Sequence, residues 1–230
     1  MAIERPVDAS SSQSAKTIER IETKGAFGES VRVVLSDGSS FFVPASLFVS
    51  EDLYPGLVLA EDRMAALGRL GEVAAIEKKA LDLLGQREHS RYQLTEKLKK
   101  RGYLPAEIAE ALDRIAAEGY LDDRRFASLW LSSRLHRNPE GRSRLQAGLR
   151  ACGVSREYAE EALSHLTEEE ENRAMREAAI RLLRHAGVDS ERLLRSLLRK
   201  GFPVRAAKRL CEELSVPQEA DASDAPRTVD

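Results

Sequence analysis

The chain has 230 residues, of which 42% are hydrophobic, 32% are charged and only 5% are aromatic. This composition favours helices built on Leu and Ala, with long solvated faces, over an aromatic-rich β-sandwich. It contains no run of 18 apolar residues and no basic start followed by an apolar core, so the sequence predicts neither a transmembrane helix nor a signal peptide. We therefore expect a cytoplasmic protein without membrane contact, in which Cys152 and Cys211 are small buried hydrophobes.

The net charge of −2 conceals blocks of opposite sign. Residues 124–150 carry seven basic residues and one acidic residue, residues 173–209 carry eleven and three, and residues 210–230 carry one and six. Blocks of one sign can guide a partner even when the whole molecule is near neutral. The two basic blocks are therefore where we look for a binding surface.

The beginning of the chain is predicted to hold a small β-rich unit. Residues 1–15 are rich in Ser and Ala without any period, and we expect a disordered leader there. Within residues 16–71, two β-branched or aromatic runs flank an Asp37-Gly38 turn, which is the strongest short pattern for a β-hairpin. The predicted elements are strands at 17–23, 31–35, 40–43 and 57–59 and a short helix at 62–70. No metal, nucleotide or catalytic motif occurs in this unit.

From Glu72 onward the sequence is helical and repetitive. Gly102, Gly153 and Gly201 are spaced by 51 and 48 residues, and setting them in register aligns nine apolar columns. A period near 50 residues is typical of arrays of stacked units. The sequence predicts three repeats, 72–120, 121–166 and 167–215, and a disordered acidic tail, 216–230. Three of the columns are Leu94, Leu145 and Leu193; Leu84, Leu135 and Leu183; and Ile115, Leu166 and Leu214.

Each repeat is predicted to contain three helices. Asp189 and Ser155 are expected to cap helices, Thr167 to open a capping box, and Asn138-Pro139 to start a helix. Each helix is too short to be stable alone in water, so burial of the shared apolar stripe must hold it. The predicted helices are 73–86, 91–101 and 105–118, then 123–137, 139–151 and 156–166, then 168–186, 190–200 and 203–214.

These patterns predict a mainly α fold. We expect three tandem three-helix repeats forming a curved, elongated array, with a small β-rich N-terminal unit. Because the caps and the core repetition begin only after Glu72, we expect the helical array to fold without residues 1–70.

The corner between the first and second repeats gives nearly every position a physical role. Gly119 is expected to end one helix in the left-handed conformation, which glycine enters without a Cβ penalty. Asp122 is expected to cap the next helix, and Asp123 to add negative charge at the positive end of its dipole. The other positions form an apolar link, Tyr120 and Leu121, and the start of the next apolar stripe, Phe126 and Ala127.

The corner, Gly-Tyr-Leu-Asp-Asp-x-Arg-Phe-Ala at residues 119–127, resembles the signature of the RecX family, bacterial proteins that regulate the RecA recombinase. The resemblance extends upstream through residues 87–94 and 97–103, and downstream through residues 142–149 and Gly153-Val154. It covers residues 72–166 well and weakens after that. Trp130 is a departure from the resemblance, because members of the family more often have a tyrosine at this position.

The resemblance implies a non-enzymatic modulator that lies in the groove of a RecA filament on DNA. The implied effect is to lower RecA ATPase, strand-exchange and co-protease activities, and so to act on recombinational repair and the SOS response. We expect a monomer without cofactors, whose partners are the RecA filament and, weakly and in a salt-dependent manner, single- or double-stranded DNA.

Basic residues are the best candidates for binding such a partner, because surface arginines suit phosphate and carboxylate recognition. Arg142 and Arg144 are expected to face solvent, since Leu145 and Leu149 take the buried stripe. Trp130 lies beside the core stripe, and either packing between repeats or a partner contact explains it. The candidates are Arg91, Lys97, Lys99, Lys100, Arg101, Arg124, Arg125, Trp130, Arg134, Arg137, Arg142, Arg144, Arg150, Arg195, Arg199 and Lys200.

The sequence does not favour an enzyme. The four histidines are scattered without metal-ligand spacing, and no glycine-rich phosphate loop occurs. Two other readings stay open. One is a DNA-binding regulator that places the helix–turn–helix corner in the major groove, and the other is a peptide-binding helical repeat.

Overall fold

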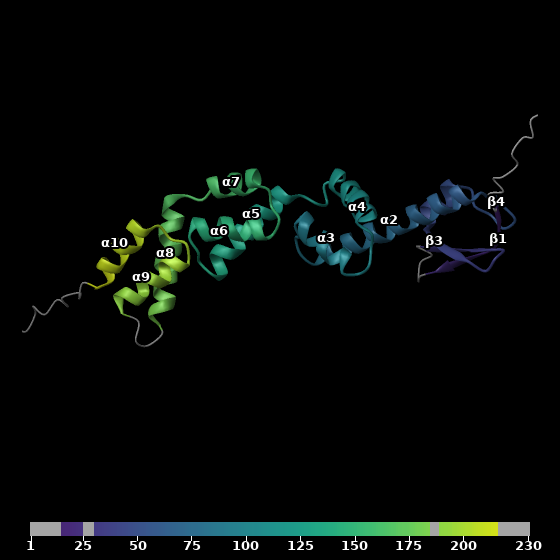
Figure 1. Ribbon diagram of the computed structural model, residues 1–230. Coiled ribbons are helices and arrows are strands. Elements are labelled where there is room, and N and C mark those ends of the chain that lie inside the picture. Colours follow the sequence, from purple (N-terminus) through teal and green to yellow (C-terminus); the bar gives the residue numbers. More distant parts are fainter. Residues whose placement is uncertain (1–14, 25–29, 185–188, 216–230) are drawn as a thin grey trace, which may run out of the picture. The chain divides into compact units, whose positions relative to one another are not determined.

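The structure is a computed structural model that describes residues 15–24, 30–184 and 189–215 (Figure 1). The leader expected at 1–15, except Ala15, and the tail expected at 216–230 lie outside the described residues. By its contacts the chain divides into two units. The first comprises residues up to His89 together with Gln93–Leu121, and the second comprises Ser90–Tyr92 and the residues from Asp122 onward.

The first unit begins with a four-stranded antiparallel sheet of order β3-β2-β1-β4. Its strands are β1 (Lys16–Lys24), β2 (Ser30–Leu35), β3 (Ser40–Pro44) and β4 (Val58–Leu59). The predicted hairpin is confirmed, since β2 pairs with β3 in a register that sets Val33 opposite Phe41, with Gly38 in the turn at φ +81°. A helix that the sequence did not predict, α1 (Ala45–Ser50), follows β3.

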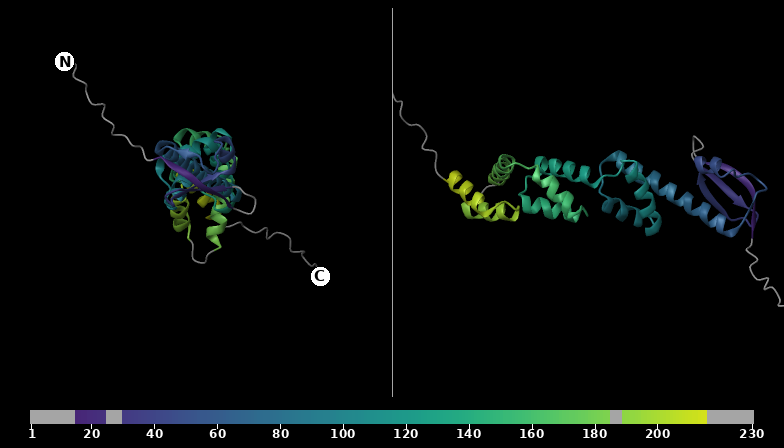
Figure 2. Two further views of the ribbon diagram at one scale, coloured as in Figure 1. Left: turned by 90° about the vertical axis from the view of Figure 1, so that its right-hand side faces the viewer. Right: turned by 90° about the horizontal axis from the view of Figure 1, so that it is seen from above.

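Helix α2 (Glu61–Gln86) runs unbroken for 26 residues, so the prediction of two separate helices at 62–70 and 73–86 is wrong. In the right-hand view of Figure 2 it leaves the sheet and continues into the first helical repeat. Its first half gives Leu67 to the core of the sheet, and its second half gives Ile76 and Ala80 to the core of the repeat. The expected boundary at 71/72 therefore falls inside a continuous helix.

Gly71, at the middle of α2, explains how this helix meets the sheet. A Cβ at this position would overlap the backbone carbonyl of Phe42 in β3. The helix therefore packs directly on the outermost strand, which covers part of the edge of the sheet. The expectation that the helical array folds without residues 1–70 stays a prediction.

The expected three-helix repeats are confirmed. The first contains α2, α3 (Arg91–Lys99) and α4 (Pro105–Ala117), the second α5 (Asp123–Arg137), α6 (Arg142–Ala151) and α7 (Arg156–Ser164), and the third α8 (Glu168–Leu183), α9 (Ser190–Arg199) and α10 (Val204–Ser215). Each repeat has a core cluster of its own. The aligned leucines 94, 145 and 193 are all fully buried, as the period predicts.

The predicted N-caps are confirmed where the capping side chain is next to its helix in the sequence. Ser155 and Asp189 cap α7 and α9 through their side chains, and Thr167 forms a complete capping box with Glu170. The start predicted at Asn138-Pro139 is wrong, because α6 begins at Arg142. Its N-cap residue is Gly141, which has no side chain to cap the helix. Asn138 and Pro139 instead contact the third repeat, as described below.

Candidate partner-binding surface

The corner at 119–127 is built as expected. Gly119 has φ +80°, and the Asp122 carboxylate accepts hydrogen bonds from the backbone N–H groups of Arg124 and Arg125. Asp123 does more than the sequence indicated, since its carboxylate accepts a 2.7 Å hydrogen bond from the backbone N–H of Arg91. Burial raises the pKa of Asp123, with the Arg91 hydrogen bond acting in the opposite direction. The remaining apolar positions pack as predicted: Leu121, Phe126 and Ala127 are buried, whereas Tyr120 is exposed.

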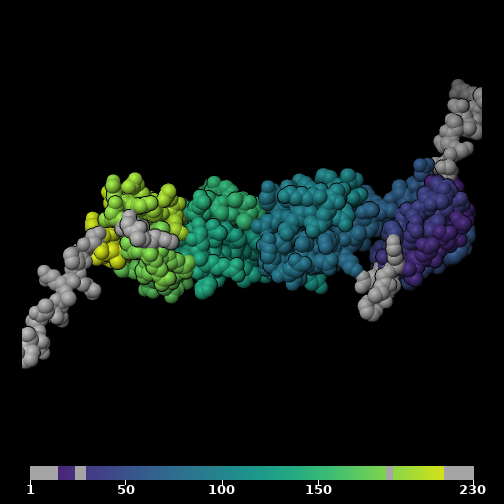
Figure 3. All heavy atoms as spheres, turned by 90° about the horizontal axis from the view of Figure 1, so that it is seen from below, coloured from purple at the N-terminus to yellow at the C-terminus, as the bar shows by residue number. Residues whose placement is uncertain are grey.

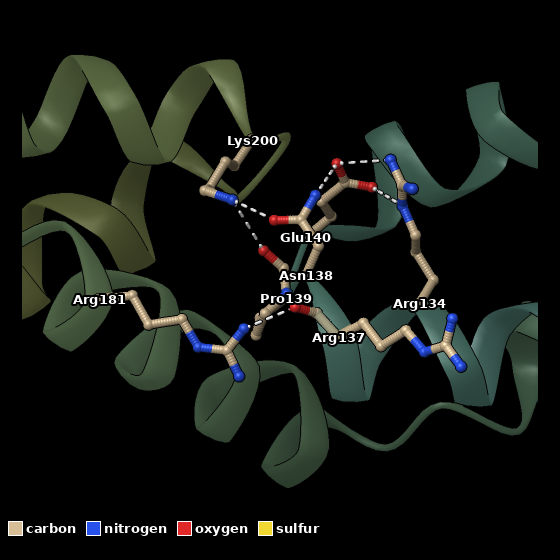
Figure 4. A network of polar contacts seen from close by, with 7 residues as sticks. All are labelled: Arg134, Arg137, Asn138, Pro139, Glu140, Arg181 and Lys200. Atoms are coloured by element: carbon tan, nitrogen blue, oxygen red, sulfur yellow. Dashed lines mark hydrogen bonds and ion pairs between the residues drawn. The ribbon is translucent and has the colours of Figure 1, made fainter.

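The junction between the second and third repeats contains a polar network that ties up two candidate cations (Figure 4). Arg134 holds the buried Glu140 carboxylate through two hydrogen bonds, of 2.9 and 3.2 Å. Asn138 donates to the same carboxylate at 3.0 Å and accepts a 2.8 Å hydrogen bond from the Lys200 ammonium. The hydrogen bond to Glu140 raises the pKa of Arg134, whereas burial lowers the pKa of Lys200.

The same junction joins the two repeats through their backbones. The N–H of Gly141 donates a 2.9 Å hydrogen bond to the carbonyl of Lys200. A Cβ on Gly141 would overlap the carbonyl of Gly201, so these two backbone segments approach as closely as glycine allows. Arg181 of α8 adds hydrogen bonds of 3.2 and 2.7 Å to the carbonyls of His136 and Arg137 at the end of α5. Figure 3 shows a continuous surface across this junction.

Arg142 is exposed, as expected, but its guanidinium is also engaged inside the second unit. Its guanidinium donates to the carbonyls of Leu163 and Leu166, at 2.9 and 3.0 Å, and to the Glu171 carboxylate at 2.6 Å. It therefore adds a donor to backbone carbonyls at and just after the end of α7, although that of Leu163 also accepts the N–H of Leu166. Although its side chain is 45% exposed, its donor atoms are already used.

Trp130 packs within the second repeat. The indole lies over Gly148 of α6, where a Cβ would overlap the ring. Arg134 covers the ring with its guanidinium carbon 5.7 Å from the centroid, a cation–π distance. Trp130 is half-buried against the second core, so its visible role is packing inside one repeat, where the sequence had placed it between repeats or at a partner.

Three candidates in the second repeat remain exposed, and their side chains form no hydrogen bond or ion pair with any part of the chain that the structure describes: Arg137, Arg144 and Arg150. In Figure 4 the Arg137 guanidinium extends away from Arg181 and Lys200. Arg124 pairs with Glu161 at 3.1 Å and covers the Tyr158 ring. Arg91 and Arg125 are half-buried. Only some of the basic side chains in the block 124–150 are therefore available to contact a partner.

The candidates in the first unit lie at the end of α3. Lys99 pairs with Glu96 at 3.1 Å, and Arg101 donates to the backbone carbonyl of Lys97 at 2.9 Å. Lys100 is exposed, and Lys97 is half-buried. Cations at a helix C-terminus are favoured by the dipole in any case, so part of this cluster serves the helix itself.

The third repeat offers more available cations than the sequence reading assigned. Arg195 is 3.6 Å from Glu191, and Arg199 donates to the Ser196 hydroxyl at 3.3 Å. Three residues of α10 that were not among the candidates are exposed and, among the described residues, unpaired: Arg205, Lys208 and Arg209. Their spacing of three and four residues puts them on one face of the helix, and that spacing could have identified them.

The described residues contain neither a metal-ligand cluster nor a membrane-spanning helix. Among them, no three His, Cys, Asp or Glu side chains gather in a way that could hold a metal ion. None of the described helices has the length and apolar character needed to cross a bilayer. Cys211 is buried, as expected, and Cys152 is half-buried.

Comparison with known proteins assigns the repeats. Residues 78–114 match the model of the first three-helix domain of RecX, and residues 122–163 match that of its second three-helix domain. The regulatory protein RecX of Halorhodospira halophila is 36% identical over 149 residues, which make up 60% of this chain and 89% of that protein. The chain belongs to the RecX family.

Two further RecX proteins extend the likeness beyond the matched repeats. The regulatory protein RecX of Bacillus subtilis is 28% identical over 209 residues, covering 89% of this chain and 79% of that protein. A crystal structure of regulatory protein RecX superimposes with a TM-score of 0.70 at 20% identity, covering 86% of this chain and 99% of that one. The fold described here is thus the RecX fold.

Proposed function

We propose that this protein regulates RecA by binding the RecA filament on DNA and lowering its ATPase, strand-exchange and co-protease activities. Membership of the RecX family carries this proposal, because its relatives are named as regulatory proteins. In this proposal the protein is a non-enzymatic, monomeric component of recombinational repair and the SOS response.

The available cations support a partner with negative charge. Exposed arginines with unused donors lie in the second repeat, at 137, 144 and 150, and on α10 of the third, at 205 and 209. Contacts of this kind add affinity for phosphate or an acidic surface that falls steeply with salt. We therefore assign filament binding chiefly to the unpaired cations, and a structural role to Arg134, Arg142 and Lys200.

The helix–turn–helix alternative has less support. A recognition helix contacts bases with residues near its N-terminus. At the start of α5, Asp122 and Asp123 place two carboxylates, and Arg124 is already paired with Glu161. This end of α5 is therefore arranged for packing within the protein, with no excess of positive charge for DNA.

Co-sedimentation with RecA tests the proposal. RecA is assembled on single-stranded DNA with a slowly hydrolysed ATP analogue, and the chain is added at moderate salt. We expect retention by RecA–DNA filaments, much weaker retention by RecA or DNA alone, and a reduced rate of DNA-dependent ATP hydrolysis in parallel assays. Retention on bare duplex with a base preference would instead support a DNA-binding regulator. An unchanged ATPase rate with no retention would contradict the proposal.

A further inference from the structure

Two exposed arginines from different repeats lie beside the same turn. Gly201, in the turn between α9 and α10, has φ +84°, and a Cβ there would lie only 2.8 Å from the Cβ of Arg144 in α6. Arg205 follows Gly201 by four residues, which span at most about 14 Å even when fully extended. Both arginines are exposed, and neither side chain forms a hydrogen bond or ion pair with the described residues. The fold therefore places two available guanidinium groups around one turn, although they are far apart in the sequence.

Backbone contacts fix the position of Arg144 beside this turn. The N–H of Gly141 donates a 2.9 Å hydrogen bond to the carbonyl of Lys200, and a Cβ on Gly141 would overlap the carbonyl of Gly201. The Lys200 ammonium also donates to Asn138 at 2.8 Å (Figure 4). A ligand that contacts both repeats here meets backbones whose spacing is already set, which lowers the ordering cost of binding.

The segments that meet at this turn contain no carboxylate. Residues 141–151, which include α6, and residues 192–211, which include most of α9 and the first two turns of α10, have no Asp or Glu. The carboxylate next to the first segment, that of Glu140, is buried and is bound by Arg134. The surface around the turn is therefore positive without local compensation.

The positive surface continues along α10. Arg205 is followed by Lys208 and Arg209 at three- and four-residue spacing, so the three side chains share one face of the helix. Lys208 and Arg209 are exposed and, like Arg205, have no ion-pair partner among the described residues. The row ends before Glu212, which is the first carboxylate of this helix.

We propose that Arg144, Arg205, Lys208 and Arg209 form one site for the phosphate backbone of the DNA strand in the filament. An uninterrupted row of cations fits a phosphate backbone, which carries one sign of charge along its whole length, better than a protein surface, where both signs are mixed. Guanidinium groups also bind phosphate through paired N–H donors. This inference rests on the proposed function and adds that these cations contact the DNA and not RecA.

The test compares Arg144→Gln combined with Arg205→Gln against Arg156→Gln combined with Arg176→Gln. The control removes the same charge from the same unit, but from arginines that are already paired with carboxylates, at 2.6 and 2.7 Å. Binding to a fluorescently labelled thymidine oligonucleotide, and to RecA filaments assembled on it, is measured by fluorescence anisotropy over a range of salt concentrations. Circular dichroism confirms that each variant is folded.

On the bare oligonucleotide we expect at least about tenfold weaker binding for the double variant, because it loses two charge-assisted contacts. The slope of log affinity against log salt should become shallower by about 1.4, since each phosphate contact on a single strand contributes about 0.7. The control should keep the wild-type slope. If the double variant melts early, Lys208→Gln combined with Arg209→Gln takes its place. A folded variant with wild-type affinity and slope overturns the proposal.

A photo-crosslinking phenylalanine analogue in place of Val204, which is 53% exposed and precedes Arg205, identifies the ligand within the filament. An adduct with DNA supports the proposal, and an adduct with RecA alone overturns it while leaving the proposed function intact. The oligonucleotide measurements need no RecA. A chain that binds DNA through these cations but does not bind filaments would therefore contradict only the proposed function, so the two failures are distinguishable.

Discussion

Arg134 binds the carboxylate of Glu140 through two hydrogen bonds, while Glu140 itself is only 6% exposed. An acidic side chain at this depth needs its partners, because a buried charge without compensation is costly. We predict that Arg134→Ala lowers the free energy of unfolding by about 1–3 kcal/mol, less than for a fully buried pair because Arg134 is partly solvated. Thermal or urea denaturation measures this. In a double-mutant cycle, Glu140→Ala should cost much less in the Arg134→Ala background, and additive losses would contradict the coupling.

Two glycines of α2 make a matched pair. Gly71→Ala forces a methyl group into the carbonyl of Phe42, whereas a Cβ at Gly68 meets no atom within 4 Å. We expect Gly71→Ala to destabilise the first unit by about 1–3 kcal/mol, and Gly68→Ala to stabilise it by up to about 1 kcal/mol through helix propensity. Urea unfolding followed by circular dichroism compares them. Equal effects of the two substitutions would mean that α2 does not pack on β3 in this way.

Gly119 tests backbone conformation separately from packing. Its φ is +80°, and a Cβ would meet no neighbouring atom, so any penalty comes from the backbone alone. We predict that Gly119→Val lowers stability by about 1–2 kcal/mol, and that Gly119→Asn costs less because asparagine tolerates this region. Melting temperatures of the two variants give the comparison. A Val variant that melts with the wild type would place Gly119 outside the left-handed region.

Substitutions at Arg142 and Arg144 should distinguish a structural role from a binding role. Arg142→Glu removes three donors and places a carboxylate near the Leu163 and Leu166 carbonyls, so we expect a loss of about 1–3 kcal/mol in unfolding free energy. Arg144→Glu should change stability by less than about 0.5 kcal/mol, because its side chain is exposed and unpaired. The Arg144 variant should bind RecA filaments more weakly, with a shallower dependence on salt. An unchanged salt slope would move the contact to the cations of α10.

His89 makes stability depend on pH. The imidazole is buried beside Gln93, and burial lowers its pKa below the ordinary value of 6.5. Below pH 6.5 the unfolded chain therefore binds a proton that the folded chain resists, and stability rises with pH across this window. We expect the unfolding free energy to fall as the pH drops from about 7 toward 5.5, measured by urea titration. His89→Asn should flatten this dependence, and the same slope in both proteins would assign it to other groups.

The sequence predicted those features that depend on neighbouring residues. The caps at Asp122, Ser155 and Thr167 are local hydrogen bonds, and helix α5 was predicted to the residue. The period near 50 residues likewise predicted which leucines are buried, because each repeat buries the same stripe.

Features made by distant residues could not be predicted. Asn138-Pro139 has the local pattern of a helix start, but Lys200, 62 residues away, holds Asn138 in the junction. In the sequence, Gly71 is an isolated glycine within a helical pattern. Nothing near it in the sequence indicates that the carbonyl of Phe42 packs against it. Arg142 and Arg144 are two residues apart and alike in sequence, and only the ends of α7 and α8 distinguish them. The net charge of a segment predicted where basic residues cluster. It did not predict which of their side chains lack a hydrogen-bond or ion-pair partner.

The continuity of α2 has a consequence for local opening of the first unit. One run of helical hydrogen bonds crosses from the core that contains Leu67 to the core that contains Ile76. Amide protons near Gly71 become accessible to solvent only when packing is lost on both sides of them, whereas those at either end need only one core to open. The slowest hydrogen exchange in this unit therefore belongs at the middle of the helix, and the sheet and the first repeat behave as a single foldon.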